Sequence, residues 1–156
     1  MRVRILAVGR AQRGPEADLV ADYLSRFDRT GRPLGLGPAT LSELDERKGG
    51  SPARDAKLFR VALRDAPSLI ALDERGRTLS SPAFAAHLAD LRDQGAREAA
   101  FLIGGADGLP PDLRGEAQLT LSFGPMVWPH LLARVMLAEQ LYRAATILAG
   151  GPYHRA

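Results

Sequence analysis

The chain has 156 residues, 46% of them hydrophobic and 25% charged, and its 21 Lys and Arg against 18 Asp and Glu give a net charge of +3. A chain of this length can bury about 70% of the surface that its unfolded form exposes, so we expect one domain spanning residues 1–156. The sequence contains no cysteine, which excludes disulfides, thiolate metal ligands and cysteine nucleophiles.

The N-terminal sequence and the distribution of apolar residues indicate a cytoplasmic protein. Arg2 and Arg4 fall within the stretch that would form the apolar part of a signal peptide. No run approaches the roughly 18 apolar residues of a membrane-spanning helix. The small positive net charge favours a polyanionic partner, but only weakly.

The first half of the chain alternates between the strand and helix periods. Residues 2–9 have the pattern of a strand, and residues 15–29 change to the helical period. A strand over 34–41 is predicted less strongly, because glycines and a proline interrupt it. A helix is predicted over 51–65, because the Ser-Pro pair at its start supplies a cap and a first residue preset for a helix.

The second half continues the alternation with an uninterrupted apolar run over 68–73, which is typical of a buried parallel strand. The remaining predicted elements are a helix over 81–94, a strand over 99–103, a short helix over 111–117, a strand over 118–123 and a long helix over 130–149. Strands that alternate with helices predict an α/β domain, with a mainly parallel sheet and helices on both faces.

Three loops of such a domain form the predicted ligand site. Ligands of parallel sheets bind beyond the carboxyl ends of the strands, which selects the loops after Leu72, Ile103 and Phe123. The glycines of loop 104–108 let a ligand approach the backbone closely, or simply make a tight turn. Asp73, at the end of its strand, can bind a ribose hydroxyl, act as a base or remain a solvated carboxylate.

The loop from Phe123 to Pro129 is unusually apolar and holds the only tryptophan of the chain, Trp128. Such a loop either packs into the core, or lines a pocket for a flat apolar ligand, or meets a partner subunit. His130 then opens the last helix, where unpaired backbone N–H groups and the helix dipole favour an anion or an electron-rich group. A histidine at this position can also be purely structural.

Charged and aromatic residues mark the last helix and the tail that follows it. Glu139 and Arg143 have the four-residue spacing of a surface ion pair. The tail brings together Tyr153, His154 and Arg155, whose side chains suit stacking on bases and contact with phosphate. The tail therefore indicates an RNA partner.

Six motifs, in this order along the whole chain, resemble the bacterial RlmH family. They are Leu72-Asp73, the loop LIGGADGL over 102–109, Trp128-Pro129-His130, Arg134-Val135, the helical AEQLYRA over 138–144, and the closing Pro152-Tyr153-His154-Arg155. Members of this family are SPOUT-class methyltransferases that modify N3 of a pseudouridine in large-subunit (23S) ribosomal RNA.

The resemblance implies an α/β domain with a C-terminal trefoil knot, S-adenosylmethionine as the cofactor, and no metal. It also implies a homodimer in which the tail of one subunit completes the site of the other. The residues that it assigns to the cofactor are Leu72, Gly104, Gly105, Phe123, Gly124, Pro125, Met126, Val127 and Trp128. We expect the RNA to be held by Arg134, Tyr153 and Arg155, and the catalytic residues to be His130, His154 and Arg143.

Methyl transfer from a sulfonium is a direct displacement, so the protein mainly aligns donor and acceptor and excludes water. The N3 proton of the pseudouridine must nevertheless leave. The residues that can take it are His130, His154, Asp73 and Glu139, and the sequence does not distinguish between them.

Two other classes of protein stay open. One is a non-catalytic nucleotide-binding or RNA-binding α/β domain. The other is a different α/β enzyme, either a phosphate-ester hydrolase or a Rossmann-type methyltransferase. A Rossmann enzyme is disfavoured because the first strand ends in a single glycine, Gly9, and a metal hydrolase is disfavoured because the three histidines are scattered.

Overall fold

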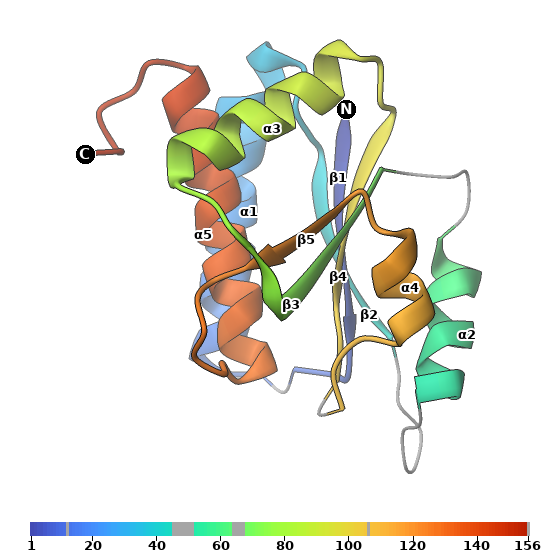
Figure 1. Cartoon of the computed structure of the whole chain (residues 1–156). Coiled ribbons are helices and arrows are strands. Elements are labelled where there is room, and N and C mark those ends of the chain that lie inside the picture. The colour runs from blue at the N-terminus through green and yellow to red at the C-terminus, as the bar shows by residue number, and fades with distance from the viewer. Residues whose placement is uncertain (12, 45–51, 64–67, 106, 156) are drawn as a thin grey trace.

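The computed structural model describes residues 1–11, 13–44, 52–63, 68–105 and 107–155. Its centre is a five-stranded sheet in the order β2-β1-β4-β3-β5, with parallel pairing between all neighbouring strands (Figure 1). The strands are β1 (Arg2–Val8), β2 (Ala39–Leu44), β3 (Ser68–Thr78), β4 (Glu98–Ile103) and β5 (Leu119–Ser122). The predicted α/β fold with a parallel sheet is confirmed.

Helices cover both faces of the sheet, as predicted (Figure 1). One face carries α1 (Pro15–Gly31), α3 (Ser81–Asp93) and α5 (His130–Leu148), and the other carries α2 (Pro52–Ala62) and α4 (Pro111–Glu116). A short 3-10 helix, η1 (Arg32–Leu34), follows α1 directly. Among the described helices, none combines the length and the apolar character that crossing a bilayer requires.

Strand β4 is apolar along almost its whole length because both of its faces are buried. All six of its residues are buried, and successive side chains of a strand point to opposite faces. Ala99 and Phe101 therefore enter the larger core beneath α1, α3 and α5, whereas Leu102 packs with Phe59 and Leu113 in the smaller core beneath α2 and α4. A strand buried on both faces reads as a continuous apolar run instead of an alternating one.

Two strands differ from their predicted bounds. The second strand begins at Ala39, not near residue 34, because Arg32–Leu34 form η1 and because Gly35 and Gly37 have φ angles of +73° and +104°. Such angles belong to the left-handed region and not to a strand.

The third strand continues to Thr78 instead of ending at Asp73. Its pairing with β5 shifts within this extension, since Leu72 and Arg77 both face Leu121. A Cβ atom at Gly76 would lie 2.6 Å from the carbonyl oxygen of Thr120, so glycine allows β3 and β5 to approach closely here. This extension is not predicted from the sequence, because the residues that follow Leu72 are charged and do not have the apolar pattern of a buried strand.

The helices lie within two or three residues of their predicted bounds wherever both ends are described. Ser51, the predicted cap of α2, lies outside the described residues. The cap of α3 is Ser80, directly before the predicted start of this helix at residue 81, and its Oγ accepts a hydrogen bond of 3.3 Å from Ala83 N. Gly95 follows α3 with a φ of +83°, as expected for a glycine just past a helix end.

Candidate functional site

A cavity of about 620 Å³ opens at the carboxyl ends of β4 and β5 and beside residues 72–75 of β3. Its size lies within the usual range for sites that bind small ligands. The three loops selected from the sequence all contribute to it, and every predicted cofactor residue except Pro125 lines it. His130, at the start of α5, lies on the same wall.

The wall formed by the loop after β4 consists of closely packed backbone. A Cβ atom on Gly104 would lie 2.2 Å from the carbonyl carbon of Gly108 and 2.6 Å from the nitrogen of Leu109. Gly108 N donates a 3.1 Å hydrogen bond to Gly105 O, which closes the loop. Only glycine fits at position 104, because the backbone of Gly108 and Leu109 occupies the place of a side chain, and the loop therefore keeps its compact form at the edge of the cavity.

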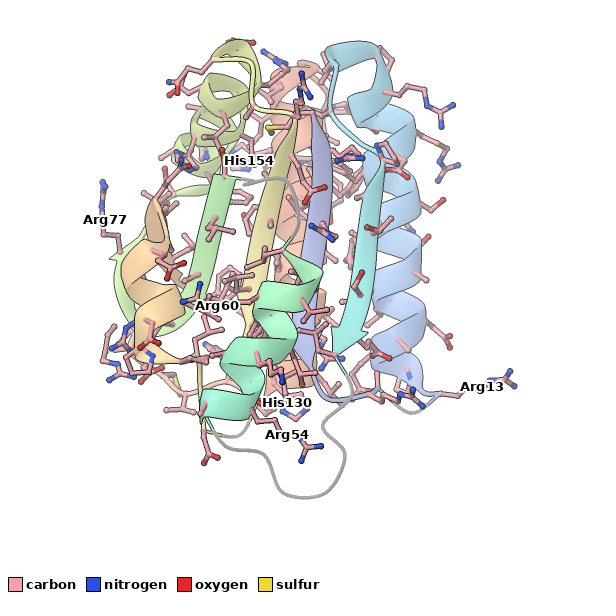
Figure 2. All side chains as sticks on the ribbon, turned by 90° about the vertical axis from the view of Figure 1, so that its right-hand side faces the viewer. Arg13, Arg54, Arg60, Arg77, His130 and His154 are labelled. Atoms are coloured by element: carbon pink, nitrogen blue, oxygen red, sulfur yellow. The ribbon has the colours of Figure 1, made fainter. Side chains whose placement is uncertain are left out.

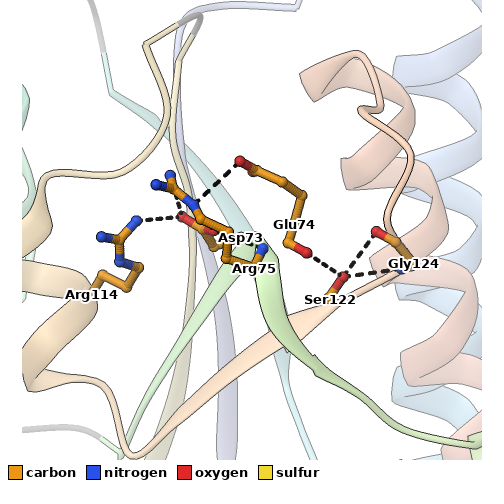
Figure 3. A network of polar contacts seen from close by, with 6 residues as sticks. All are labelled: Asp73, Glu74, Arg75, Arg114, Ser122 and Gly124. Atoms are coloured by element: carbon orange, nitrogen blue, oxygen red, sulfur yellow. Dashed lines mark hydrogen bonds and ion pairs between the residues drawn. The ribbon is translucent and has the colours of Figure 1, made fainter.

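The loop after β5 supplies an apolar wall that is open to solvent. Met126, Val127 and Trp128 are 69%, 85% and 41% exposed as whole residues, and Leu132 in the first turn of α5 is 40% exposed. Contiguous exposed apolar residues of this kind mark a ligand-binding or subunit-binding surface. The backbone of the loop is nevertheless fixed at its start, because Ser122 Oγ donates to Glu74 O (3.1 Å) and accepts from Gly124 N (3.0 Å) (Figure 3).

Asp73 lies at the rim of the cavity, where two arginines hold its carboxylate (Figure 3). The side chain is 3% exposed. Oδ1 accepts from the backbone N (2.9 Å) and Nε (3.0 Å) of Arg75, and Oδ2 accepts from Nη1 of Arg114 (2.9 Å). Burial by itself raises the pKa of Asp73, but the hydrogen bonds from Arg75 and Arg114 outweigh it and lower the pKa below the ordinary value. A carboxylate in this state is a poor proton acceptor at neutral pH.

Replacement of Asp73 by Asn is expected to lower the free energy of unfolding at pH 7 by about 1–3 kcal/mol, because the two arginines lose a buried charged acceptor. A lowered pKa in the folded state contributes stability above the unfolded-state pKa, and this contribution disappears as the pH falls through the folded-state pKa. The difference between the wild type and Asp73→Asn should therefore shrink below the ordinary aspartate pKa of 3.8. Urea denaturation between pH 3 and 7 measures it.

The matched control for this change is Asp93→Asn. Asp93 also accepts from an arginine, Arg92 Nε at 2.7 Å, but its side chain is 65% exposed. Exposed pairs contribute about 0–1 kcal/mol, so the control should change stability little at any pH. Equal effects of the two substitutions would contradict the role assigned to Asp73.

The tail leaves α5 at the end far from the cavity and turns back, so that Tyr153 reaches Glu139 near the middle of the helix. Figure 2 shows His130 and His154 near opposite ends of the molecule. The 19 residues of α5 span about 28 Å at the rise of an α-helix. Tyr153 OH donates to Glu139 Oε1 (3.0 Å), and the Arg143 guanidinium lies 4.8 Å from the Tyr153 ring centroid. The structure therefore divides the predicted site residues into two groups, which a single chain does not bring together.

Arg134 lies in neither group, which corrects the expectation that it contacts RNA. Its side chain is 1% exposed. Nη2 donates to the carbonyl oxygens of Val8 (2.8 Å) and Gly9 (2.9 Å), and Nη1 donates to Glu43 Oε1 (2.8 Å). Glu43 Oε1 in turn accepts from Ala11 N (2.7 Å). Arg134 thus fixes the loop after β1 against α5, and a lone arginine within an apolar helix gives no sequence signal for this role.

A second, largely apolar cavity of about 380 Å³ lies between α1, β2 and the start of α5. Its walls include Val20 and Leu24 of α1 and Leu131 of α5. Leu19, the neighbour of Val20 on α1, is 45% exposed. The sequence alone gives no signal for this groove, because apolar residues at helical spacing in 15–29 and 130–149 are the pattern of ordinary helices packed on a core.

A family model described as "Predicted SPOUT methyltransferase" matches residues 1–154. Proteins named ribosomal RNA large subunit methyltransferase H are similar over the full length. Those of Cereibacter sphaeroides and Dinoroseobacter shibae are 63% identical, and that of Ruegeria pomeroyi is 61% identical, over 155 residues that cover 99% of this chain and 99% of each relative.

Solved structures with low sequence identity share the fold. A probable methylase family protein from Haemophilus influenzae has a TM-score of 0.54 at 13% identity, and the match covers 99% of this chain and 70% of that one. A probable methyltransferase from Bordetella pertussis has a TM-score of 0.54 at 17% identity, and the match covers 92% of this chain and 96% of that one. At these identities the likeness concerns the fold alone.

Proposed function

The chain belongs to the SPOUT methyltransferase family, and from this membership we propose that it transfers a methyl group from S-adenosylmethionine to N3 of a pseudouridine in large-subunit ribosomal RNA. The observation that carries the proposal is the 63% identity, over nearly the whole chain, to proteins named ribosomal RNA large subunit methyltransferase H. The base and the atom come from the resemblance of the six sequence motifs to the RlmH family.

The cavity at the strand ends has the chemistry that this cofactor needs. Gly104 and Gly105, Leu72 and the apolar loop 123–128 line the cavity and would hold the cofactor through backbone and apolar contacts. The cofactor contributes a methyl group on a positively charged sulfur. The side chains around it align this methyl group with the nitrogen and exclude water.

Two of the four residues that can accept the N3 proton are occupied by other donors. Asp73 is held by Arg75 and Arg114, and Glu139 is held by Arg143 and Tyr153. His130 is exposed at the edge of the cavity. We therefore propose that the N3 proton is accepted by His130, or by His154 of a tail that approaches from a second chain. The N3–H bond breaks and the N3–methyl bond forms as the bond between the methyl group and sulfur breaks.

Replacement of His130 by Ala is expected to lower kcat by about 10-fold to 100-fold, because a positioned base is lost while water can still take the proton. The affinity for S-adenosylhomocysteine should change by less than about threefold, because the cofactor contacts are mainly with backbone and apolar groups. Single-turnover methylation and calorimetry measure the two effects. Equal losses in rate and affinity would make His130 a structural residue.

The separation of the two groups along α5 supports a homodimer. Within one chain, Tyr153 is held at Glu139, nine residues or about 14 Å along α5 from His130, so we infer that a tail that acts at the cavity comes from another copy. The apolar groove between α1 and α5, together with the exposed Leu19 and Leu132, offers a surface for the second copy. Arg143 and Arg155 then join the site with Tyr153 as contacts to the RNA.

We also propose that the C-terminal part of the chain forms the trefoil knot of the family. The proposal rests on membership of the SPOUT methyltransferase family, whose model matches residues 1–154. Because the proposed substrate is ribosomal RNA, we also propose that the protein acts in the cytoplasm.

The experiment that tests the function uses ribosomes from a strain that lacks this chain. The purified protein, S-adenosylmethionine with a labelled methyl group and these ribosomes are incubated, and the large-subunit RNA is mapped by mass spectrometry. A single new methyl group on a pseudouridine is expected. Binding of the RNA with no affinity for S-adenosylhomocysteine in calorimetry would instead indicate the non-catalytic RNA-binding domain.

A further inference from the structure

We propose that Glu139 is a positioning residue that fixes the C-terminal tail in the orientation from which the tail reaches the methylation site. The inference rests on the proposed function for its effect on catalysis. The geometry on which it is based concerns only the packing of the tail on α5.

The carboxylate of Glu139 connects the tail to two helices. Oε1 accepts hydrogen bonds from Tyr153 OH (3.0 Å) and from Nε (3.0 Å) and Nη2 of Arg143. Oε2 accepts from Gln140 Nε2 (2.8 Å), and the amide oxygen of Gln140 accepts from Ser81 Oγ (2.8 Å) at the start of α3. The orientation of the carboxylate is therefore fixed from α3 and α5 before the tail binds to it.

The Tyr153 ring is enclosed on two sides as well. The ring of Tyr142 lies 4.6 Å away between centroids, and the guanidinium carbon of Arg143 lies 4.8 Å from the Tyr153 centroid. Burial raises the pKa of Tyr153, and its hydrogen bonds to Glu139 and Tyr23 raise it further. Tyr153 thus stays a protonated donor to the carboxylate throughout the physiological pH range.

The chain after α5 turns back so that this contact can form. Gly150 has a φ of +67°, and Gly150 N and Gly151 N donate to Ile147 O (3.0 Å) and Thr146 O (2.8 Å). This is the pattern of hydrogen bonds that ends a helix with a left-handed glycine. It returns the tail along α5, so that Tyr153 meets a residue 14 positions earlier in the sequence.

These contacts differ from those of an ordinary surface ion pair. Terminal residues usually lack order unless side chains tie them down. Here one carboxylate, 17% exposed, accepts from the tail and from two residues of its own helix. His154 and Arg155 then extend from a fixed point, which reduces the ordering cost when they meet the RNA.

The test compares Glu139→Gln with a matched control, Glu116→Gln, in the full-length protein. Glu116 also accepts two hydrogen bonds from one arginine, Arg60, at 2.7 and 3.3 Å, but it lies on the opposite face of the sheet (Arg60 is labelled in Figure 2). Four quantities are measured for each variant. They are amide hydrogen exchange over 151–155, kcat/KM for ribosomes, the Kd for S-adenosylhomocysteine and the melting temperature.

For Glu139→Gln we expect amide exchange over 151–155 to accelerate at least about tenfold, and kcat/KM for ribosomes to fall by about 10-fold to 100-fold, because a small misplacement of a catalytic group has effects of this size. The Kd for S-adenosylhomocysteine and the melting temperature should match those of the control. Adding Tyr153→Phe to Glu139→Gln should lower kcat/KM for ribosomes little further, because both substitutions weaken the same contact between Tyr153 and residue 139.

Unchanged exchange of the tail in Glu139→Gln would overturn the inference. So would a loss of cofactor affinity or of melting temperature as large as the loss of activity, because Glu139 would then support the fold as a whole. If the wild-type chain transfers no methyl group to ribosomes, the proposed function fails. The hydrogen-exchange comparison still decides whether Glu139 holds the tail.

Discussion

Removal of residues 152–156 is expected to lower kcat/KM for ribosomes by at least about 1,000-fold, because Tyr153, His154 and Arg155 supply the stacking and phosphate contacts that position the base. The Kd for S-adenosylhomocysteine should change by less than about twofold, since none of the described tail residues 152–155 lines the cavity. A methyl-transfer assay on ribosomes and calorimetry with the cofactor product measure the two quantities.

A second chain, in which Gly and Ser replace residues 152–156 one for one, separates the side chains from the length of the tail. It should be as inactive as the truncated chain. If the truncated protein methylates ribosomes at the wild-type rate, the tail has no role in the reaction. A parallel loss of cofactor affinity would mean that the truncation damages the cavity.

Replacement of Gly104 by Ala is expected to weaken the binding of S-adenosylmethionine by at least about 100-fold, because the loop must open to admit the new methyl group and its wall then moves into the site. The added Cβ would lie 2.2 Å from the carbonyl carbon of Gly108 and 2.3 Å from its oxygen. These are rigid backbone atoms and not the end of a flexible side chain. Calorimetry measures the loss of affinity.

The matched control is Gly115→Ala in α4. A Cβ atom there meets nothing within 4 Å, and alanine stabilises a helix by up to about 1 kcal/mol relative to glycine. This variant should bind the cofactor like the wild type and melt at the same temperature or slightly higher. If Gly104→Ala binds the cofactor equally well, the glycine loop does not form part of the cofactor site.

The α/β fold and the location of the cavity are predictable because they depend on local patterns. The buried strand of β4 and the glycine loop after it are both visible in the sequence from Glu98 to Gly108, and parallel sheets bind ligands at the ends of such strands. The apolar run before Asp73 predicts the first part of the neighbouring strand β3 in the same way.

Features that depend on contacts between distant segments are not predictable in this way. Arg134 reads as an exposed cation, but it is buried against carbonyls of the loop after β1, more than 120 positions away in the sequence. The extension of β3 past Asp73 depends on its pairing with β5. The charged residues of this extension form part of the cavity rim, where Arg75 and Arg114 hold Asp73.

Of the contacts that the Glu139 carboxylate makes with Arg143 and with Tyr153, only the one with Arg143 can be predicted from the sequence. The four-residue spacing of Glu139 and Arg143 predicts their ion pair, which is confirmed. The sequence does not show that the chain turns back at Gly150 and brings a second donor to the same carboxylate. The length of α5 is predicted from the sequence, but the position of the tail relative to the cavity also depends on this reversal, which is not.

The most direct test of a site shared between two chains is a mixed dimer of two inactive variants. A chain with Gly104→Ala and a chain without residues 152–156 are co-expressed with different affinity tags, and the dimer that carries both tags is purified. One of its two sites has an intact cavity and an intact tail, so it should methylate large-subunit RNA at about half the wild-type rate. A mixed dimer as inactive as its two parents would contradict the shared site.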